Sequence, residues 1–473
     1  MVEKVNTSYK KVLMLLCSGT FLEYFDFALY IHMAVLLNEL FFPAVDETSK
    51  LILASTTFYM SFVGRIAGGF FFGWIGDKYG RRAVIIIATA FMAITSLTIA
   101  NLPTYTQIGI IASIIMFLCR ILQGISSLGE LLGSEIYLME TVRERPLQYS
   151  VVASIAIFSS LGGICALSFC SLIFYYEMNW RLAFWFGSVI AIISFMCRKK
   201  LSENSDFLNS QKTGLEILKN LKASNEYKES AIKSEILQST ILDPKIPIKT
   251  IIAYASIEIP YAVYSFFSII YCSNILRTQF AYTPQKIIFH NLIVGIIDCI
   301  GYVCITFLVY KFFPLLLFRL RLIVFIIFSL LLPYFMDISS SPMELLYIQG
   351  FMMFFMPTSA CGAPIFFSHV FVGKRFKFVF RTFAISRAIV YVLVSFYLIK
   401  LIEYFGYYGI YFLSIPILSF TFWGIHVFFQ LEKENGTDVS KWINSPSIYK
   451  ENFLQPWYQK KKNTEALIKF VTK

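Results

Sequence analysis

The sequence has few charged residues and few histidines for its length. Only 15% of its 473 residues are Asp, Glu, Lys or Arg, and four are histidine. Soluble domains carry about 25% charged residues, so this composition excludes a single water-soluble core. Neither the scattered histidines nor the nine cysteines, which all fall in apolar segments, have metal-ligand spacing, so we expect no metal and no cofactor. No Walker-type phosphate loop occurs, so ATP is not the expected energy source.

Apolar residues are abundant instead. They make up 57% of the chain, and the mean hydropathy is +0.66. A helix needs about 20 apolar residues to cross the hydrocarbon core of a bilayer. On that length, the pattern predicts an all-α membrane protein with about twelve transmembrane helices. The expected spans are 12–37, 50–73, 83–101, 107–139, 149–174, 181–198, 250–276, 287–310, 321–337, 343–369, 380–404 and 407–430.

The net charge of +12 comes mainly from loops between the apolar segments, which is a topology signal of membrane proteins and not a sign of nucleic-acid binding. Basic residues occupy alternate loops, so we expect both termini in the cytoplasm and the protein in the cell (inner) membrane. The first span has no small-residue cleavage pattern behind it, which indicates a retained helix and not a signal peptide.

Polar segments divide the chain into four parts. We predict an amino-terminal six-helix bundle at 1–198, a cytoplasmic linker at 199–249, a carboxy-terminal six-helix bundle at 250–430 and a cytoplasmic tail at 431–473. Six spans on each side of a central loop is the layout of two-bundle transporters. We expect a monomer in the lipid bilayer.

A short charged loop, GWIGDKYGRR at residues 73–82, lies between the second and third spans. It resembles the signature loop of the major facilitator superfamily, which implies that superfamily's fold of two six-helix bundles. The resemblance also implies a conformational latch made by Gly73, Asp77, Gly80, Arg81 and Arg82. A generic basic turn that only sets orientation is the alternative.

Two carboxylates lie within one turn of the first span. Glu23, Asp26 and Tyr30 are spaced so that they share one helix face. Repulsion and desolvation favour a proton on one such carboxylate, so we predict that Glu23 and Asp26 exchange a proton during transport. The alternative is that Glu23 pairs with an arginine and joins two helices.

The fourth span carries a polar stripe on an otherwise apolar helix. Arg120, Gln123, Ser127 and Glu130 follow one another at helical spacing. Arg120 either neutralises a carboxylate of the first span or binds a substrate carboxylate through its planar fork. Arg65 in the second span has a plainer expected role, packing against a carboxylate of a neighbouring helix.

The seventh, eighth and tenth spans hold further polar candidates. In the seventh, Glu258 and Tyr261 share one face and are candidates to bind the cationic end of a zwitterion, with core packing as the alternative. Asp298 and His290 are lone candidates in the eighth span. Prolines and glycines of the tenth span predict a breakable helix: Gly350, Pro357, Gly362 and Pro364.

Several motifs narrow the resemblance to one family. The stretches GTFLEYFDF at 19–27, FVGRIAGG at 62–69, RILQG at 120–124 and NWRLAF at 179–184 resemble those of the metabolite:proton symporter family. That family includes proline/betaine, shikimate, 2-oxoglutarate and citrate carriers. The resemblance implies that the polar core positions of the family are Glu23, Asp26, Arg65, Arg120 and Glu130.

The second half departs from the pattern. Where a repeat of the signature loop is expected, the chain reads YKFFPLLLFR at 310–319, without an aspartate or a glycine–arginine pair. A weaker latch between the carboxy-terminal helices is therefore expected. The tail lacks the heptads of some osmosensing relatives, which argues against osmotic regulation.

The leading functional hypothesis is proton-coupled import of a small polar metabolite by alternating access. We predict proton coupling by Glu23, Asp26 and Glu130, and substrate binding by Tyr30, Arg120, Gln123, Glu258 and Tyr261. One or two unpaired arginines at the membrane midplane and a glutamate, Glu258, in the other half favour a zwitterion such as proline or a betaine over a dicarboxylate or shikimate. A proton-antiport efflux pump and a non-transporting membrane sensor are alternatives. An enzyme is not expected, because no nucleophile–base pair is apparent.

Overall fold

A computed structural model shows the fold and describes residues 2–42, 47–142, 144–203, 208, 246–370 and 372–435. Most of the predicted linker, 199–249, and most of the predicted tail, 431–473, lie outside these residues. The described part of the chain contains helices and no strand. Helices suit a bilayer because each pairs its own backbone N–H and C=O groups, which lipid cannot hydrogen-bond.

The amino-terminal group of helices begins at Val2 and ends at Arg198. It consists of α1 (Val2–Phe41), α2 (Glu47–Lys78), α3 (Arg81–Asn101), the short α4 (Tyr105–Ile108), α5 (Ile110–Thr141), α6 (Leu147–Tyr175) and α7 (Arg181–Arg198).

The carboxy-terminal group has more interruptions. It consists of α11 (Ile248–Ser265), η1 (Phe266–Tyr271), α12 (Cys272–Thr278), α13 (Pro284–Lys311), α14 (Pro314–Ile338), α15 (Pro342–Phe355), η2 (Ser359–Cys361), α16 (Ala363–Ser368), η3 (Val372–Lys374), α17 (Arg375–Phe405), η4 (Gly406–Ile410) and α18 (Tyr411–Glu434).

The long helices match the predicted spans. Among the described residues, 10 helical segments are long and apolar enough to cross a membrane, and the last of them, Val372–Glu434, runs through both α17 and α18. Separating these two helices and including α2 gives the twelve long segments that the hydropathy pattern predicts. The predicted all-α membrane fold is therefore confirmed.

Local sequence explains where several helices begin. Pro284 and Pro342 each stand in the first turn of a helix, where a missing N–H costs nothing. Ser341 and Glu344 form a capping box at the start of α15, each side chain bonding the backbone N–H of the other. Gly80 turns the chain sharply between α2 and α3 with φ of 104°, a conformation that favours glycine.

The tenth span is broken, as its prolines and glycines predict. Helix α15 ends at Phe355, and the next helical residues are the 3₁₀ turn η2 from Ser359. Pro357 lies in the gap, where it cannot continue the helical hydrogen bonds. The seventh span is also irregular, because Pro260 lies inside α11 and a π-helical segment, η1, follows it.

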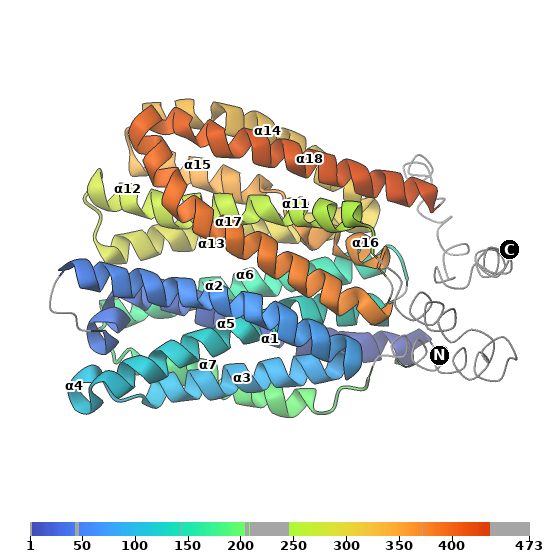
Figure 1. The fold of residues 1–473 in the computed structure, drawn as a ribbon, viewed down its shortest axis with the longest axis horizontal. Coiled ribbons are helices and arrows are strands. Elements are labelled where there is room, and N and C mark those ends of the chain that lie inside the picture. The colour runs from blue at the N-terminus through green and yellow to red at the C-terminus, as the bar shows by residue number, and fades with distance from the viewer. Residues whose placement is uncertain are drawn as a thin grey trace, which may run out of the picture.

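The two groups of helices lie side by side (Figure 1). Helices α1 to α7 form one group and α11 to α18 the other, with the long helices of both running roughly along the same direction. Helix α13 packs against α6, and α17 packs against α2, so these two pairs of helices form most of the contact between the groups. The start of α1, the α2–α3 turn and the described end of α18 lie at the same end of the molecule (Figure 1).

Apolar side chains cover much of the outside. Phe307 is 72% exposed and Ile110 is 66% exposed, and many other large apolar residues face outward as well. A soluble protein does not expose so much apolar surface, whereas a bilayer accommodates it. Many charged side chains are buried instead, among them Glu23, Arg120 and Arg387.

Candidate functional site

A small polar pocket lies inside the amino-terminal group, between α1, α2, α3 and α5. Its volume is about 20 Å³, enough for about one water molecule. We call it the charged pocket, because two carboxylates and two guanidiniums face it. It is lined by Glu23, Asp26, Phe27, Ser61, Arg65, Met92, Arg120, Gln123, Gly124 and Ser127.

Within this pocket, Gln123 bridges Asp26 and Arg120. The Arg120 guanidinium donates to the side-chain oxygen of Gln123 at 2.6 Å, and the Gln123 amide donates to Asp26 at 3.2 Å. The Ser96 hydroxyl donates a further hydrogen bond to the same Asp26 oxygen. The other oxygen, Oδ1, is buried and has no hydrogen-bond partner among the described residues. Asp26 is thus partly satisfied and keeps one oxygen available for a proton.

Arg120 is held on both sides. Besides Gln123, it donates to the Ser61 hydroxyl at 3.0 Å, and its guanidinium carbon lies 3.5 Å from the ring centroid of Tyr30. The structure therefore brings Arg120, Gln123 and Tyr30 together with Asp26. All four belong to the amino-terminal group, and no described residue of the other group lines the charged pocket.

Glu23 lies at the other side of the pocket and faces Arg65. Their closest oxygen–nitrogen distance is 3.9 Å, and both side chains are largely buried. The Arg65 guanidinium carbon also lies 4.7 Å from the ring centroid of Phe27. The second oxygen of Glu23 has no hydrogen-bond partner among the described residues. The arginine next to Glu23 is thus Arg65 and not Arg120.

Glu130 occupies a different environment from the other predicted proton carriers. It forms a buried ion pair with Arg198 of α7 and accepts a hydrogen bond from Thr89. Arg198 also donates to the carbonyl oxygens of Leu15 and Leu16, at 2.9 Å each. This network ties α5 and α7 to α1. Glu130 lines neither the charged pocket nor the larger cavity described next.

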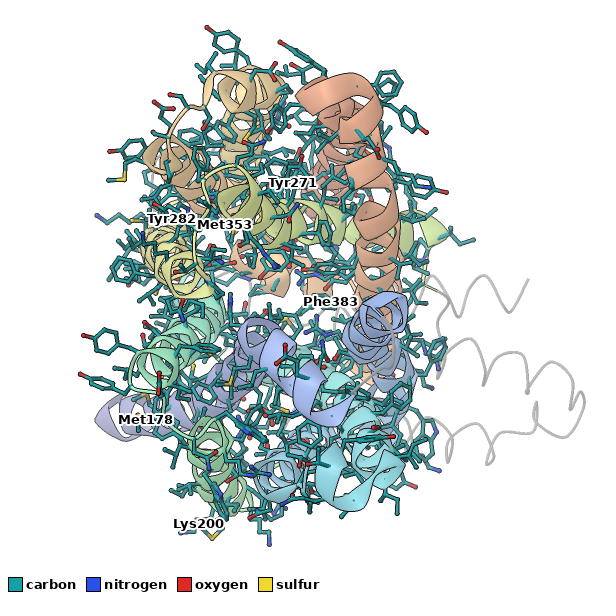
Figure 2. The ribbon with its side chains drawn as sticks, turned by 90° about the vertical axis from the view of Figure 1, so that its left-hand side faces the viewer. Met178, Lys200, Tyr271, Tyr282, Met353 and Phe383 are labelled. Atoms are coloured by element: carbon teal, nitrogen blue, oxygen red, sulfur yellow. The ribbon has the colours of Figure 1, made fainter. Side chains whose placement is uncertain are left out.

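A larger central cavity of about 160 Å³ lies between the two groups of helices. Phe383, which lines it, lies close to the boundary between the groups in Figure 2. Its wall is formed by α1, α5 and α6 of one group and by α11, η1, α13, α15, η2 and α17 of the other. The polar and aromatic lining residues are Tyr24, Phe27, His32, Glu135, Ser159, Ser160, Tyr261, Asn291, Asp298, Tyr302, Thr358, Ser359, Phe383 and Arg387.

Arg387 brings the positive charge to this cavity. It donates through Nε and Nη2 to one oxygen of the buried Glu258, at 3.1 and 2.8 Å. Its guanidinium carbon lies 4.3 Å from the ring centroid of Tyr261 and 4.1 Å from that of Phe383. Sequence reasoning did not single out Arg387, although an arginine near the middle of a long apolar segment is the same signal that identified Arg120.

Two carboxylates and five aromatic rings face the same space. Glu135 comes from α5 of the amino-terminal group, and Asp298 comes from α13 of the other group and accepts a hydrogen bond from Ser160 at 3.3 Å. The rings are those of Tyr24, Phe27, Tyr261, Tyr302 and Phe383. Walls of this kind offer partners for both a carboxylate and a cation.

The remaining predicted polar residues differ in their relation to this cavity. Glu258 is behind Arg387 and is not itself a lining residue, whereas Tyr261 lines the cavity. His290 is hydrogen-bonded to Gln349 at 2.7 Å, which explains a buried histidine in structural terms. In the described part of the chain, no three His, Cys, Asp or Glu side chains gather as metal ligands.

The signature loop joins the two groups at one end. The Asp77 carboxylate accepts hydrogen bonds from the backbone N–H groups of Phe376 at 3.2 Å and Lys377 at 3.0 Å, in the first turn of α17. A carboxylate at a helix N-terminus is favourable, because it faces the positive end of the helix dipole. Close packing of α2 on α17 at Gly73 and Gly76 brings Asp77 within reach.

A buried charge cluster reinforces this contact. Arg81 donates through two nitrogens to Glu140, at 2.9 and 3.0 Å, and Arg375 at the start of α17 donates to the same carboxylate at 2.5 Å. Arg81 also donates to the carbonyl oxygen of Val372 at 2.7 Å, across the two groups. Arg82 instead donates to the carbonyl oxygen of Lys199 at 2.7 Å, within its own group.

This architecture is that of a membrane transporter for a small solute. The sequence model of the Major Facilitator Superfamily matches residues 16–370. The chain belongs to the major facilitator superfamily. By its family it is a multi-pass transporter and not an enzyme.

Curated relatives match part of the chain. The proline/betaine transporter of Salmonella typhimurium is 35% identical over 197 residues, which are 40% of this chain and 39% of the relative. The glycine betaine/proline/ectoine/pipecolic acid transporter of Dickeya dadantii is 34% identical over 196 residues, with the same shares. The chain thus spans about two fifths of the length of these relatives.

Solved structures share the fold over most of the chain. The proton:xylose symporter XylE bound to 6-bromo-6-deoxy-D-glucose superposes with a TM-score of 0.71 at 15% identity, covering 90% of this chain and 96% of that one. The human organic anion transporter MFSD10 gives a TM-score of 0.60 at 14% identity, covering 88% and 99%. At these identities the likeness establishes the fold alone.

Proposed function

We propose that this protein is a proton-coupled symporter that imports a small zwitterion such as proline or a betaine. The observation that carries the proposal is the central cavity, where Arg387 lies among aromatic rings while Glu135 and Asp298 line the same space. A guanidinium recognises a carboxylate, and aromatic faces with nearby carboxylates recognise an ammonium or quaternary ammonium group. Relatives named proline/betaine transporters support the same substrate class.

The charge balance of the cavity favours a zwitterion over a dicarboxylate. Among the described residues that line it, Arg387 is the one arginine or lysine, whereas Glu135 and Asp298 are both acidic. A dicarboxylate would bring two negative charges to a space that already holds two acidic side chains. A zwitterion adds no net charge, so its binding costs less electrostatic free energy.

The charged pocket is the proposed site of proton coupling. Glu23 and Asp26 each keep one buried oxygen without a hydrogen-bond partner among the described residues. A proton on such an oxygen removes a buried negative charge, so gain and loss of the proton can follow the conformational cycle. Glu130 is less suited to this role, because Arg198 and Thr89 already satisfy it.

We further propose alternating access around the central cavity, with the α2–α3 end facing the cytoplasm of the cell and the protein acting as a monomer. The Asp77 and Glu140 contacts hold the two groups together at that end. Transport then requires these contacts to break and re-form as the groups rock about the cavity.

Uptake into proteoliposomes tests this function. Labelled glycine betaine, proline, 2-oxoglutarate and shikimate are offered separately, with and without an inward pH gradient. We expect glycine betaine or proline to accumulate, and the accumulation to collapse when a protonophore removes the gradient. Accumulation of 2-oxoglutarate or shikimate alone would move the protein to another substrate class, and gradient-independent uptake would exclude symport with protons.

A further inference from the structure

Phe27 is the one described residue that lines both the charged pocket and the central cavity. It lies on α1 between two sets of neighbours. Glu23 and Asp26 line the charged pocket, whereas Ala28 and His32 line the central cavity. The two spaces are otherwise bounded by different side chains, so the Phe27 ring forms their common wall.

The ring is in contact with a charge on the side of the charged pocket. The Arg65 guanidinium carbon lies 4.7 Å from the ring centroid, and Arg65 also approaches Glu23 to 3.9 Å. The attraction between a cation and an aromatic face depends on where the ring stands. Displacing the ring therefore changes how firmly Arg65 is held beside Glu23.

We propose that Phe27 couples substrate in the central cavity to the proton on Glu23. A substrate cation that contacts the ring competes with Arg65 for the negative charge of the same π system. The ring then holds Arg65 less firmly beside Glu23. Arg65 neutralises the Glu23 carboxylate less well, and Glu23 takes up a proton. This inference rests on the proposed function, and it makes Phe27 a positioning residue, because the ring acts on Glu23 through Arg65.

Other charges also act on the two carboxylates. Arg65, Glu130, Arg387 and Glu135 interact electrostatically with Glu23. Asp26 faces Arg120, Ser96 and Gln123. A substitution at Phe27 leaves the charge of each of these groups in place, so a ring-free variant separates transmission through the ring from direct electrostatic interaction.

Linkage provides a test that does not depend on transport. If a proton strengthens substrate binding by some factor, substrate strengthens proton binding by the same factor. Isothermal titration calorimetry of the full chain in nanodiscs, with glycine betaine and with proline at acidic and at alkaline pH, measures that factor. Repeating the titration in buffers of different ionisation enthalpy counts the protons taken up.

We expect the parent protein to bind more tightly at acidic pH, by about fivefold or more. In Phe27→Leu the ratio between the two affinities should fall towards one, with loss of the proton uptake. Phe27→Tyr keeps the ring and should keep the ratio. Tyr302→Leu, which removes a ring from the central cavity alone, is the matched control and should weaken binding equally at both pH values.

The possible failures are distinguishable. An unchanged affinity ratio in Phe27→Leu, with the parent ratio reproduced, overturns the role of Phe27 and leaves the symporter proposal standing. A parent protein that binds neither ligand, or binds without any pH dependence, overturns the proposed function and this inference with it. If Phe27→Leu does not fold, Phe27→Met serves as a second ring-free variant and is judged by the same criterion.

Discussion

At the scale of single residues, the acceptors around each buried arginine decide what that arginine can still bind. Arg120 donates to Gln123 and Ser61 and lies against the ring of Tyr30, inside one group of helices. Arg387 donates two hydrogen bonds to a single oxygen of Glu258 and lines the cavity between the groups. A guanidinium has five N–H donors, so Arg387 retains donors for a substrate carboxylate.

We therefore expect Arg387→Lys to weaken substrate binding, because an ammonium cannot reproduce the planar fork. The loss should be about 1.5–3 kcal/mol, the scale of hydrogen bonds to charged groups. Arg120→Lys should leave the binding free energy nearly unchanged. Calorimetric titration with glycine betaine or proline measures both. A larger loss in Arg120→Lys than in Arg387→Lys would place the carboxylate clamp in the charged pocket.

The carboxylates of α1 lead to a second residue-scale prediction. Glu23→Gln and Asp26→Asn keep the side-chain shape but cannot gain or lose a proton, so each should abolish accumulation driven by a pH gradient. Exchange of labelled for unlabelled substrate should survive better, since it needs no net proton movement. Asp298→Asn, outside the charged pocket, should have a milder effect.

Proteoliposome assays of accumulation and of exchange, run on the same preparations, test this pair. If Glu23→Gln and Asp26→Asn both concentrate substrate as the parent does, the proton site lies elsewhere.

At the scale of elements, the start of α17 is where the two groups depend on each other. Its backbone N–H groups bond Asp77 of α2, and its first residue, Arg375, shares Glu140 with Arg81. The first N–H groups of an α-helix have no acceptor within the helix. In α17 the N-cap residue, Lys374, makes no side-chain cap hydrogen bond to them. The other group therefore supplies the cap.

Removing the two carboxylates should have unequal effects on stability. Asp77→Asn keeps an acceptor for the helix N-terminus and loses only the charge, so it should cost about 0.3–1 kcal/mol. Glu140→Gln leaves two buried guanidiniums without their counter-charge, and should cost about 3–5 kcal/mol.

Thermal unfolding of the detergent-solubilised protein, compared at one protein concentration, gives the order of the two variants. A midpoint that falls no further in Glu140→Gln than in Asp77→Asn would mean that the cluster contributes little to the described conformation.

At the scale of the whole molecule, the two ends of the helix groups differ. The signature-loop contacts lie at the end that holds the start of α1 and the described end of α18 (Figure 1). The turn between α6 and α7, which contains Glu177, connects those helices at their other ends. Basic loops tend to face the cytoplasm in membrane proteins, so we propose that the signature-loop end lies on that side.

Cysteine labelling of intact cells tests the orientation. In a variant without the nine native cysteines, Lys200→Cys and Glu434→Cys place thiols at exposed positions of the signature-loop end. We expect both to react only after the membrane is permeabilised, whereas Glu177→Cys should react from outside. Labelling of Lys200→Cys or Glu434→Cys in sealed cells would invert the proposed topology.

The sequence by itself determined the helical membrane fold, the position of each long helix and the faces that carry polar residues. The reason is that these depend on properties local to the chain. A bilayer demands about 20 apolar residues per helix with every backbone group internally paired. The helical repeat then places Glu23 with Asp26, and Arg120 with Gln123, on common faces. Proline and glycine likewise marked the break in the tenth span.

Only the tertiary structure decided which charge meets which. Glu23 lies beside Arg65, Glu130 beside Arg198 and Glu258 beside Arg387, and each pair joins different helices. Periodicity orders side chains around one helix axis but does not say which neighbour that face meets. That choice depends on how all the helices pack together, so the separation of the charged pocket from the central cavity emerged only from the folded chain.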